Sequence, residues 1–380
     1  MKIGIDARTL VGNISGVGNY LVNIIESGAF AGQTLYAYYN DRTDESPVSI
    51  ETPEDTTLVW RPISAPRLAD DLLGPAAPAW WVNVTLLRAL KQDRIDAFFG
   101  PNFVQPILFD GPSAIVVHDM IHRTYPDAHP RLYRIYLQAF LGRAVKKADR
   151  VITVSHHSER DLRKYRDISP ERISVAPGAA NDRYRPRDLS SETCDRLQRK
   201  YELPDRFLLY VGNIEPRKNL VTVIDALSMM DDEERPPLVI VGKEQLADEE
   251  FKAVYQRCGF KDQITFTGYV AEEDLPLLYN MAQIFVFPSL YEGFGLPVLE
   301  AIQSGTPVIT SNTSSLPEVV GDAAITVDPR DSATISQAIH DLWEDKGARE
   351  EYRELGRERA TQFSWQQSAK KIEQTWDSIF

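Results

Sequence analysis

The stretch Ile284–Thr310, IFVFPSLYEGFGLPVLEAIQSGTPVIT, decides the fold class of this 380-residue chain. It starts with an apolar run, passes through a glycine-rich turn, continues as a helical pattern from Leu296 to Ser304 and ends in a second apolar run. Short, continuously apolar runs are typical of parallel strands that are buried on both faces. A strand, a helix and a second strand in this order form the repeating unit of α/β proteins.

Similar apolar runs recur along the chain in two series, which are separated by a Pro- and Arg-rich joint at Asn181–Arg187. The first series comprises KIGID near residue 2, LYAYY near 35, TLVW near 57, DAFFG near 96, SAIVVHD near 113, DRVITVS near 149 and RISVAPG near 172. The second comprises FLLYVGN near 207, PLVIVGK near 237, ITFTGYV near 264, IFVFPSL near 284, TPVITS near 306 and AAITVD near 323. Alternation of strands and helices in two halves predicts two doubly wound α/β domains.

We therefore expect a first domain at residues 1–180 and a second at residues 181–364. A final amphipathic helix, at about residues 365–380, is expected to cross back onto the first domain. Ligands of such sheets bind at the carboxyl ends of the strands, so two facing sheets would create a central cleft.

Composition narrows the class of protein. Lys and Arg total 42 against 55 Asp and Glu, a net charge of -13, which disfavours a general nucleic-acid role. The two cysteines fit no disulfide or metal pattern, so we expect a cytoplasmic protein. The opening MKIGIDART indicates a buried strand rather than a signal peptide, and no apolar stretch is long enough to span a membrane.

The motif with the strongest chemical signal is EGFGLPVLE, from Glu292 to Glu300. Gly293 and Gly295 permit tight backbone geometry, and Pro297 suits the first turn of a helix. Backbone N–H groups at this turn could bind anionic or hydroxyl groups, while one carboxylate reaches a sugar hydroxyl and the other a ribose diol. The structural alternative is a helix capped by a glycine turn, with two solvated glutamates.

A second motif, VGNIEPRKNL at Val211–Leu220, follows a strand directly. Arg217 and Lys218 stand where a helix is expected to begin, so their charges add to that of the helix N-terminus. This is the chemistry that neutralises a diphosphate leaving group. A solvated basic surface is the alternative.

A third motif, ISGVGNY at Ile14–Tyr20, follows the first strand. Its glycines are a fragment of a dinucleotide fingerprint, but Leu21 occupies the final glycine position, so a dehydrogenase is disfavoured. Gly16 and Gly18 would let the backbone approach a donor phosphate or an acceptor, or would form a structural turn.

The fourth motif, VVHDM at Val116–Met120, ends a strand. His118 could hydrogen-bond a sugar hydroxyl, or it could be a structural histidine. The chain contains no G-x-S-x-G, D-x-D or His/Cys cluster with ligand spacing, so we expect neither a hydrolase triad nor a bound metal or other cofactor.

Taken together, these segments resemble glycosyltransferase family 4, a family of retaining enzymes that includes bacterial cell-surface mannosyltransferases. The resemblance covers nearly the whole chain and implies an α/β GT-B fold, with two Rossmann-like doubly wound domains that face a central cleft. The first domain would bind the acceptor and the second the nucleotide sugar. The segments that carry it are the glycine loop, VVHD, DRVITVS, GNIEPRKNL, ITFTGYV and FPSLYEGFGLPVLEAIQSGTPVITSNTSSLPEVVGDAA.

The resemblance also implies roles for single residues. Arg217 and Lys218 would hold the donor diphosphate, His118 would contact the transferred sugar, and the glycine loop is matched loosely by Gly16 and Gly18. The transferred sugar would also be bound by Glu292 and by the backbone of Gly293, Phe294, Gly295 and Leu296. Tyr269 and Val270 would meet the base, and Glu300 would bind the ribose.

The function expected from the resemblance is metal-independent transfer of a hexose, with mannose from GDP-mannose as the leading donor, to a saccharide or lipid-linked saccharide in polysaccharide or O-antigen synthesis. A UDP-sugar transferase is the alternative within the family. A sugar-nucleotide epimerase and a non-catalytic nucleotide-binding protein are alternatives from other classes.

Two segments raise the question of peripheral contact with the inner face of the plasma membrane. Leu72–Leu90 places Trp80 and Trp81 in an apolar stretch, and Arg131–Arg150 interleaves aromatic and basic residues. Such a face could dock on anionic lipid. A core helix with a solvated basic face explains the second segment equally well.

Overall fold

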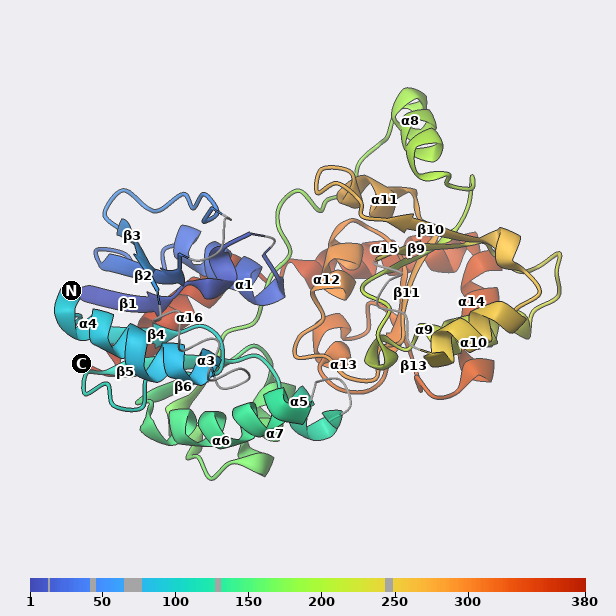
Figure 1. Cartoon of the computed structure of the whole chain (residues 1–380). Coiled ribbons are helices and arrows are strands. Elements are labelled where there is room, and N and C mark those ends of the chain that lie inside the picture. Colours follow the sequence, from blue (N-terminus) through green and yellow to red (C-terminus); the bar gives the residue numbers. More distant parts are fainter. Residues whose placement is uncertain (13, 42–45, 65–76, 127–130, 243–248) are drawn as a thin grey trace. The chain divides into compact units, whose positions relative to one another are not determined.

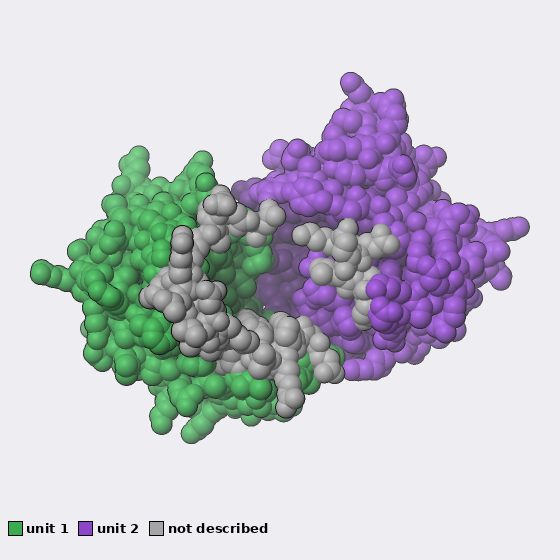
Figure 2. Space-filling view, in the orientation of Figure 1, with its two compact units in different colours: residues 1–178, 364–380 green, residues 179–363 purple. Residues whose placement is uncertain are grey.

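The computed structural model describes residues 1–12, 14–41, 46–64, 77–126, 131–242 and 249–380, without the side chains of residues 131, 132, 133 and 136. The chain divides into two compact units, residues 1–178 with 364–380 and residues 179–363 (Figure 2). The first division falls between Gly178 and Ala179, beside the expected boundary at 180/181. Each unit is described by itself.

Unit 1 contains a seven-stranded sheet in the described part of the chain, with every pair of neighbouring strands parallel. Its strand order is β3-β2-β1-β4-β5-β6-β7. The strands are β1 (Lys2–Asp6), β2 (Thr34–Asn40), β3 (Thr57–Ile63), β4 (Ala97–Gly100), β5 (Ser113–Val117), β6 (Arg150–Thr153) and β7 (Ile173–Val175).

Helices cover this sheet, and both ends of the chain belong to the unit (Figure 1). They are η1 (Arg8–Leu10), α1 (Gly16–Glu26), α3 (Ala77–Trp80), the π-helical turn η3 (Trp81–Leu86), α4 (Leu87–Asp93), α5 (Ile121–Thr124), α6 (Arg131–Lys147), α7 (His156–Tyr165), η5 (Pro170–Arg172) and α16 (Trp365–Asp377).

Unit 2 contains a six-stranded parallel sheet in the residues that the structure describes, with the order β10-β9-β8-β11-β12-β13. The strands are β8 (Leu208–Val211), β9 (Leu238–Val241), β10 (Ile264–Gly268), β11 (Ile284–Phe287), β12 (Val308–Ser311) and β13 (Ile325–Val327). The helices are α8 (Ser191–Tyr201), η6 (Pro216–Lys218), α9 (Leu220–Ser228), α10 (Glu249–Arg257), η8 (Lys261–Gln263), α11 (Leu275–Met281), α12 (Leu296–Gln303), α13 (Leu316–Val320), α14 (Ser332–Glu344) and α15 (Lys346–Ala360).

Burial explains why the apolar runs become strands. The runs LVIV of β9 and IFVF of β11 are buried at every position, as expected for central parallel strands that are covered on both faces. The predicted α/β fold with two doubly wound sheets is therefore confirmed. In both sheets the strand order reverses beside the first strand, at β1/β4 and at β8/β11. Ligands of doubly wound sheets bind at the carboxyl ends of the strands at this point.

The C-terminal helix α16 packs in unit 1, against α1, β6 and β7. Trp376 makes edge-to-face contacts with Phe30 and Phe99, and Trp365 makes one with Tyr20. These aromatic pairs attach the last residues of the chain to the same core that contains β1 and β4.

Helix α6 uses its apolar side chains for the core of unit 1. Leu137, Leu141 and Val145 belong to the buried cluster, while Lys146 and Lys147 are exposed. These three side chains therefore serve the core and the basic face is solvated, but Ile135 is 53% exposed and the side chains of Tyr133 and Tyr136 lie outside the described residues, so membrane contact stays a prediction. In the other suggested segment Trp81 is buried and Trp80 is 38% exposed, while residues 72–76 lie outside the described residues. No helix among the described residues is long and apolar enough to cross a membrane.

The two glycines of the third motif meet different surroundings. A Cβ at Gly18 would lie 2.3 Å from the backbone oxygen of Thr9, whereas a Cβ at Gly16 would have nothing within 4 Å. Gly18 therefore allows α1 to pack closely on η1, which is a structural reason for a glycine at this position.

We expect Gly18→Ala to lower the free energy of unfolding by about 1–3 kcal/mol, because the added methyl group forces a backbone shift. Gly16→Ala is the matched control, since both substitutions gain the same helix propensity in α1. Chemical denaturation measures both. Equal stabilities of the two variants would contradict the packing argument.

Candidate active site

The site in unit 2 is built on the loops that follow β8 and β11, the two strands at the point where the order reverses. The first loop carries Arg217 and Lys218 in the 3-10 turn η6, and the second carries Glu292. The structure brings these three side chains together. Lys218 Nζ lies 2.6 Å from Glu292 Oε1, and Arg217 Nη1 lies 3.0 Å from the same oxygen.

A third donor completes the contacts of this oxygen. Ser289 Oγ donates to Glu292 Oε1 at 2.9 Å. Ser289 was not singled out from the sequence, although it stands three residues before the glutamate in the motif. All three of these donors bond Oε1 rather than Oε2.

Burial strengthens the attraction between the Glu292 carboxylate and the two cations. Lys218 and Glu292 are 8% and 9% exposed. Burial by itself raises the pKa of Glu292, but Lys218 and Arg217 outweigh it and hold the pKa below its ordinary value. Burial lowers the pKa of Lys218, opposed by the charge of Glu292. Glu292 is therefore an ionised acceptor rather than a proton donor.

The backbone around Glu292 is held by two serines of the loop between β12 and α13. Ser314 Oγ donates to the Glu292 carbonyl at 2.6 Å, and Ser315 Oγ donates to the carbonyls of Glu292 and Phe294 at 2.9 and 2.8 Å. These bonds fix the turn that leads into α12. Sequence reasoning did not identify either serine as part of the site.

The glycine turn itself requires a special backbone. Gly295 has φ +111°, and a Cβ there would lie 2.7 Å from Leu316 Cδ2. It caps α12, which begins at Leu296. The ring of Phe294 is buried against Phe363, so only its backbone is available to a ligand. The N–H groups from Gly293 onward lie at the N-terminus of α12, where helix geometry favours anionic or hydroxyl groups.

Glu300 lies within α12, and its surroundings differ from those of Glu292. Burial raises the pKa of Glu300 to about 7, opposed by hydrogen bonds from the Tyr279 and Tyr184 hydroxyls and by the charge of Arg183. Tyr279 Oη donates to Glu300 Oε2 at 3.2 Å. Neither tyrosine could be identified from sequence spacing.

The expected base-binding segment follows β10 at the same edge of the sheet. Gly268 has φ +66° at a bulge that ends the strand, which leaves Tyr269 77% exposed and Val270 buried. The exposed ring of Tyr269 is thus available to a flat ligand, while Val270 contributes backbone only.

In unit 1, His118 follows β5 and is packed among aromatic rings. Its Nε2 lies 2.8 Å from the carbonyl oxygen of Pro101, and the rings of Tyr20 and Phe103 make edge-to-face contacts with it. Burial lowers the pKa of His118 to about 4, opposed by the bond to Pro101. A carbonyl can only accept, so Nε2 carries the proton and Nδ1 of the neutral ring is an acceptor.

Helix α1 is part of the same arrangement. Its Tyr20 contacts the His118 ring at 5.4 Å between centroids and donates from Oη to the carbonyl of Ala176 at 2.9 Å. The structure therefore connects the glycine motif with His118 through Tyr20, and it places Gly16 at the exposed start of the helix.

A cavity of about 270 Å³ opens in unit 1 where the strand order reverses. Asp6 is the last residue of β1, and Arg8 pairs with it at 2.6 Å while covering the ring of Trp81. Sequence reasoning did not select these residues. The lining combines a charged pair with an apolar wall and consists of Asp6, Arg8, Thr9, Pro78, Asn102, Phe103, Val104 and Leu137.

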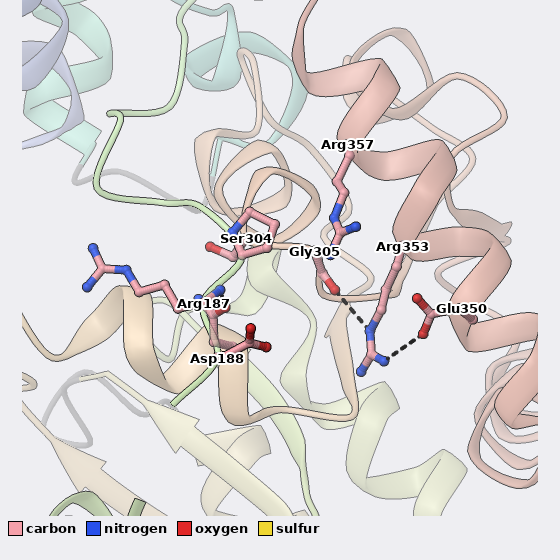
Figure 3. A pocket seen from close by; sticks show the side chains of 9 residues that line it. Arg187, Asp188, Ser304, Gly305, Glu350, Arg353 and Arg357 are labelled. Atoms are coloured by element: carbon pink, nitrogen blue, oxygen red, sulfur yellow. Dashed lines mark hydrogen bonds and ion pairs between the residues drawn. The ribbon is translucent and has the colours of Figure 1, made fainter. Parts of the chain in front are cut away.

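A second cavity, of about 420 Å³, lies at the C-terminal end of α12 in unit 2 (Figure 3). Arg353 and Arg357 extend from α15 toward Gly305, and Arg353 Nε donates to the Gly305 carbonyl at 3.2 Å. Arg353 also pairs with Glu350. These contacts stabilise the end of α12, opposite to the end that carries the glycine turn. The cavity is therefore separate from the candidate site.

Among the described residues, no group of three or more His, Cys, Asp or Glu side chains could hold a metal ion.

We expect selectively ¹⁵N-labelled His118 to show a protonated Nε2 and an unprotonated Nδ1 at pH 7, because of burial and the Pro101 carbonyl. Since the unfolded chain protonates histidine near pH 6.5, the stability that neutral His118 contributes is lost as the pH falls from about 6.5 toward 4. NMR titration measures both the tautomer and the midpoint. A protonated Nδ1, or a midpoint near 6.5, would contradict this assignment.

Comparisons with known proteins identify the family of the chain. Residues 14–183 match the family described as Glycosyltransferase Family 4, and residues 195–359 match that described as Glycosyl transferases group 1. The chain is 36% identical to the O-antigen chain mannosyltransferase B of Escherichia coli over 298 residues, which is 78% of this chain and 75% of that protein.

Two further proteins are similar to this chain: the first is much longer than the matched region, and the second shows similarity of the fold alone. The serotype-specific mannosyltransferase WbdA of Escherichia coli is 33% identical over 67% of this chain, but the match spans only 32% of its own length. Sucrose-phosphate synthase from Thermosynechococcus elongatus has a similar structure, with a TM-score of 0.78, 21% identity and coverage of 100% of this chain and 99% of that chain.

Proposed function

The chain belongs to glycosyltransferase family 4 and is a glycosyltransferase, and we propose that it transfers mannose from GDP-mannose to a saccharide or lipid-linked saccharide acceptor. Its place would be the synthesis of a cell-surface polysaccharide. The similarity to O-antigen mannosyltransferases supports the sugar and the process. The observation that carries the transfer chemistry is the convergence of Arg217, Lys218 and Glu292 where the strand order reverses.

Arg217 and Lys218 would stabilise the leaving diphosphate. The Arg217 side chain also pairs with the partly exposed Glu215, with Nε 3.2 Å from Oε2. A bound diphosphate would take the place of Glu215 on the guanidinium, while Glu292 keeps both cations oriented. Charge stabilisation of this kind needs no metal ion, because fixed cations in a water-poor site interact strongly with the developing negative charge.

The transferred sugar would lie against Glu292 and the N-terminus of α12. Oε2 of the ionised Glu292 could accept a sugar hydroxyl, and backbone N–H groups from Gly293 to Leu296 could donate to others. His118 Nδ1, an acceptor in the neutral ring, would receive a further hydroxyl. Glu300 would bind the ribose, and Tyr269 with Val270 would meet the base.

Retention of configuration is proposed to follow front-face substitution. The acceptor oxygen forms a bond to the anomeric carbon on the face from which the phosphate departs, and the departing phosphate takes the acceptor proton. No side chain needs to act as a nucleophile in this reaction. The protein supplies position and charge stabilisation.

The acceptor is proposed to enter the cavity of unit 1. Asp6 and Arg8 offer an acceptor and donors for saccharide hydroxyls, and Phe103 and Leu137 offer an apolar wall for the C–H face of a sugar ring. Phe103 also contacts His118, so the cavity and the proposed sugar contact share a side chain. A UDP-sugar donor remains the alternative, because the base would be bound largely by backbone.

A thermal-shift panel of GDP, UDP, ADP and their sugar conjugates tests the donor, without added metal. We expect selective stabilisation by GDP and GDP-mannose, because a ligand of the folded state adds RT ln(1 + [L]/Kd) to its stability. Selectivity for UDP ligands would overturn the proposed donor but not the transfer chemistry.

Incubation of the protein with the donor alone tests the alternatives from other classes. Hydrolysis or epimerisation of the donor without an acceptor would favour the epimerase alternative, and binding without turnover would favour a non-catalytic protein.

Arg217→Ala and Lys218→Ala should each lower kcat by roughly 30- to 1,000-fold, which corresponds to about 2–4 kcal/mol of lost transition-state stabilisation. Arg196→Ala and Lys200→Ala are matched controls, since these cations of unit 2 pair with Asp274 outside the site. Steady-state kinetics on folded protein measures the effect. Wild-type kcat in both site variants would refute the leaving-group role.

A further inference from the structure

Two tyrosine hydroxyls from outside α12 converge on the carboxylate of Glu300. Tyr279 comes from α11 and donates to Oε2 at 3.2 Å. Tyr184 belongs to the segment 179–187, through which the chain enters unit 2, and its hydroxyl bonds the same carboxylate. A residue of the joint between the units thus reaches the proposed nucleotide site.

Both tyrosine rings are held in place. Tyr279 is fully buried and makes edge-to-face contacts with Tyr184 and Phe285, at 5.8 and 5.3 Å between centroids. Tyr184 is 8% exposed, and its carbonyl accepts a hydrogen bond from Gln303 Nε2 at 2.8 Å. Since neither ring can swing without disturbing this packing, the two hydroxyls occupy defined positions.

The Glu300 carboxylate has more hydrogen-bond acceptor sites than the two tyrosine hydroxyls use. An ionised carboxylate has about four lone-pair sites, and the two tyrosines use two of them. Glu300 as a whole residue is partly exposed, and the remaining acceptor sites are those that an incoming ligand would use. Two free acceptors on one carboxylate match the two neighbouring hydroxyls of a ribose.

We propose that Tyr184 and Tyr279 are positioning residues, which hold the Glu300 carboxylate in the orientation that accepts the ribose diol of the donor nucleotide. The proposal rests on the assignment of Glu300 to the ribose. It also means that nucleotide binding and the anchoring of the segment 179–187 depend on the same carboxylate.

Charged groups around Glu300 set the pH dependence that follows. Arg183 lowers the pKa of Glu300, and Arg183 itself pairs with Glu272 at 3.0 Å. On α15, which packs against α12, Arg353 contacts Gly305 beyond the other end of the helix. Burial leaves the pKa of Glu300 at about 7, so the ionised form that accepts two hydroxyls becomes available as the pH rises through neutrality.

The experiment measures the affinity of GDP-mannose, or of a UDP-sugar if the ligand panel selects it, by calorimetry between pH 5.5 and 9, because the diphosphate of a nucleotide sugar does not titrate in this range whereas the terminal phosphate of GDP does. Wild-type affinity should rise with pH around a midpoint near 7. Tyr184→Phe and Tyr279→Phe keep the rings but remove the hydroxyls that favour the ionised carboxylate. Each should move the midpoint up by about one pH unit and weaken binding at pH 7 several-fold, because a hydrogen bond to a charged group is lost.

The remaining variants separate the possible failures. Tyr38→Phe is the matched control, since Tyr38 is a buried tyrosine of unit 1 whose hydroxyl donates to Asp93 at 2.8 Å, and it should leave the midpoint unchanged. Glu300→Gln should weaken binding and abolish the pH dependence. Wild-type affinity and pH dependence in Glu300→Gln would reject the ribose assignment itself. A strong effect of Glu300→Gln, with wild-type midpoints in both tyrosine variants, would overturn the positioning role alone.

The effect should fall on nucleotide affinity rather than on the chemical step. In steady-state kinetics we expect KM for the donor to rise in Tyr184→Phe and Tyr279→Phe while kcat at saturating donor stays close to wild type. Partial loss of folding would instead lower kcat and the melting temperature together. It would leave the midpoint of the pH profile unchanged.

Discussion

The buried ion cluster at Glu292 Oε1 is the interaction on which the candidate site of unit 2 depends. It joins the loop after β8 to the loop after β11, because Lys218 and Arg217 belong to one loop and Glu292 to the other. Removing one partner of a buried pair leaves an uncompensated charge, which is far more costly than losing a surface pair. The cluster therefore orients the cations and also holds the turn that starts α12.

The two glutamates of the motif show how environment divides similar groups into different roles. Lys218 and Arg217 keep the pKa of Glu292 low, whereas burial beside neutral tyrosine hydroxyls raises that of Glu300 to about 7. One carboxylate is thus a permanent anion that orients cations. The other is an acceptor whose charge depends on pH, which suits a neutral hydroxyl ligand rather than a phosphate.

Unit 1 repeats the topology of unit 2 but carries different chemistry at the corresponding place. Burial and the Pro101 carbonyl keep His118 neutral, and the nearby cavity offers one ion pair and an apolar wall. Such a surface recognises hydroxyls and C–H faces rather than a strong anion. This contrast is the reason for proposing a saccharide site in unit 1 and a nucleotide diphosphate site in unit 2.

By itself, the sequence determined the two doubly wound sheets and the core of the candidate site. Continuous apolar runs such as IFVF at Ile284–Phe287 predict buried parallel strands, and glycine turns after such strands indicate where Arg217, Lys218 and Glu292 lie. These signals are local, because backbone geometry and burial on both faces leave their pattern in neighbouring residues.

Only the tertiary structure decided which distant side chains complete the site and which aromatic residues belong to the core. Tyr184 and Tyr279 are far apart in the chain and reach Glu300 through packing, so no spacing rule could pair them. Leu137 could face lipid or the core with the same helical pattern, and only its burial against the sheet distinguishes the two. Long-range contacts of this kind depend on how elements pack, which local periodicity does not encode.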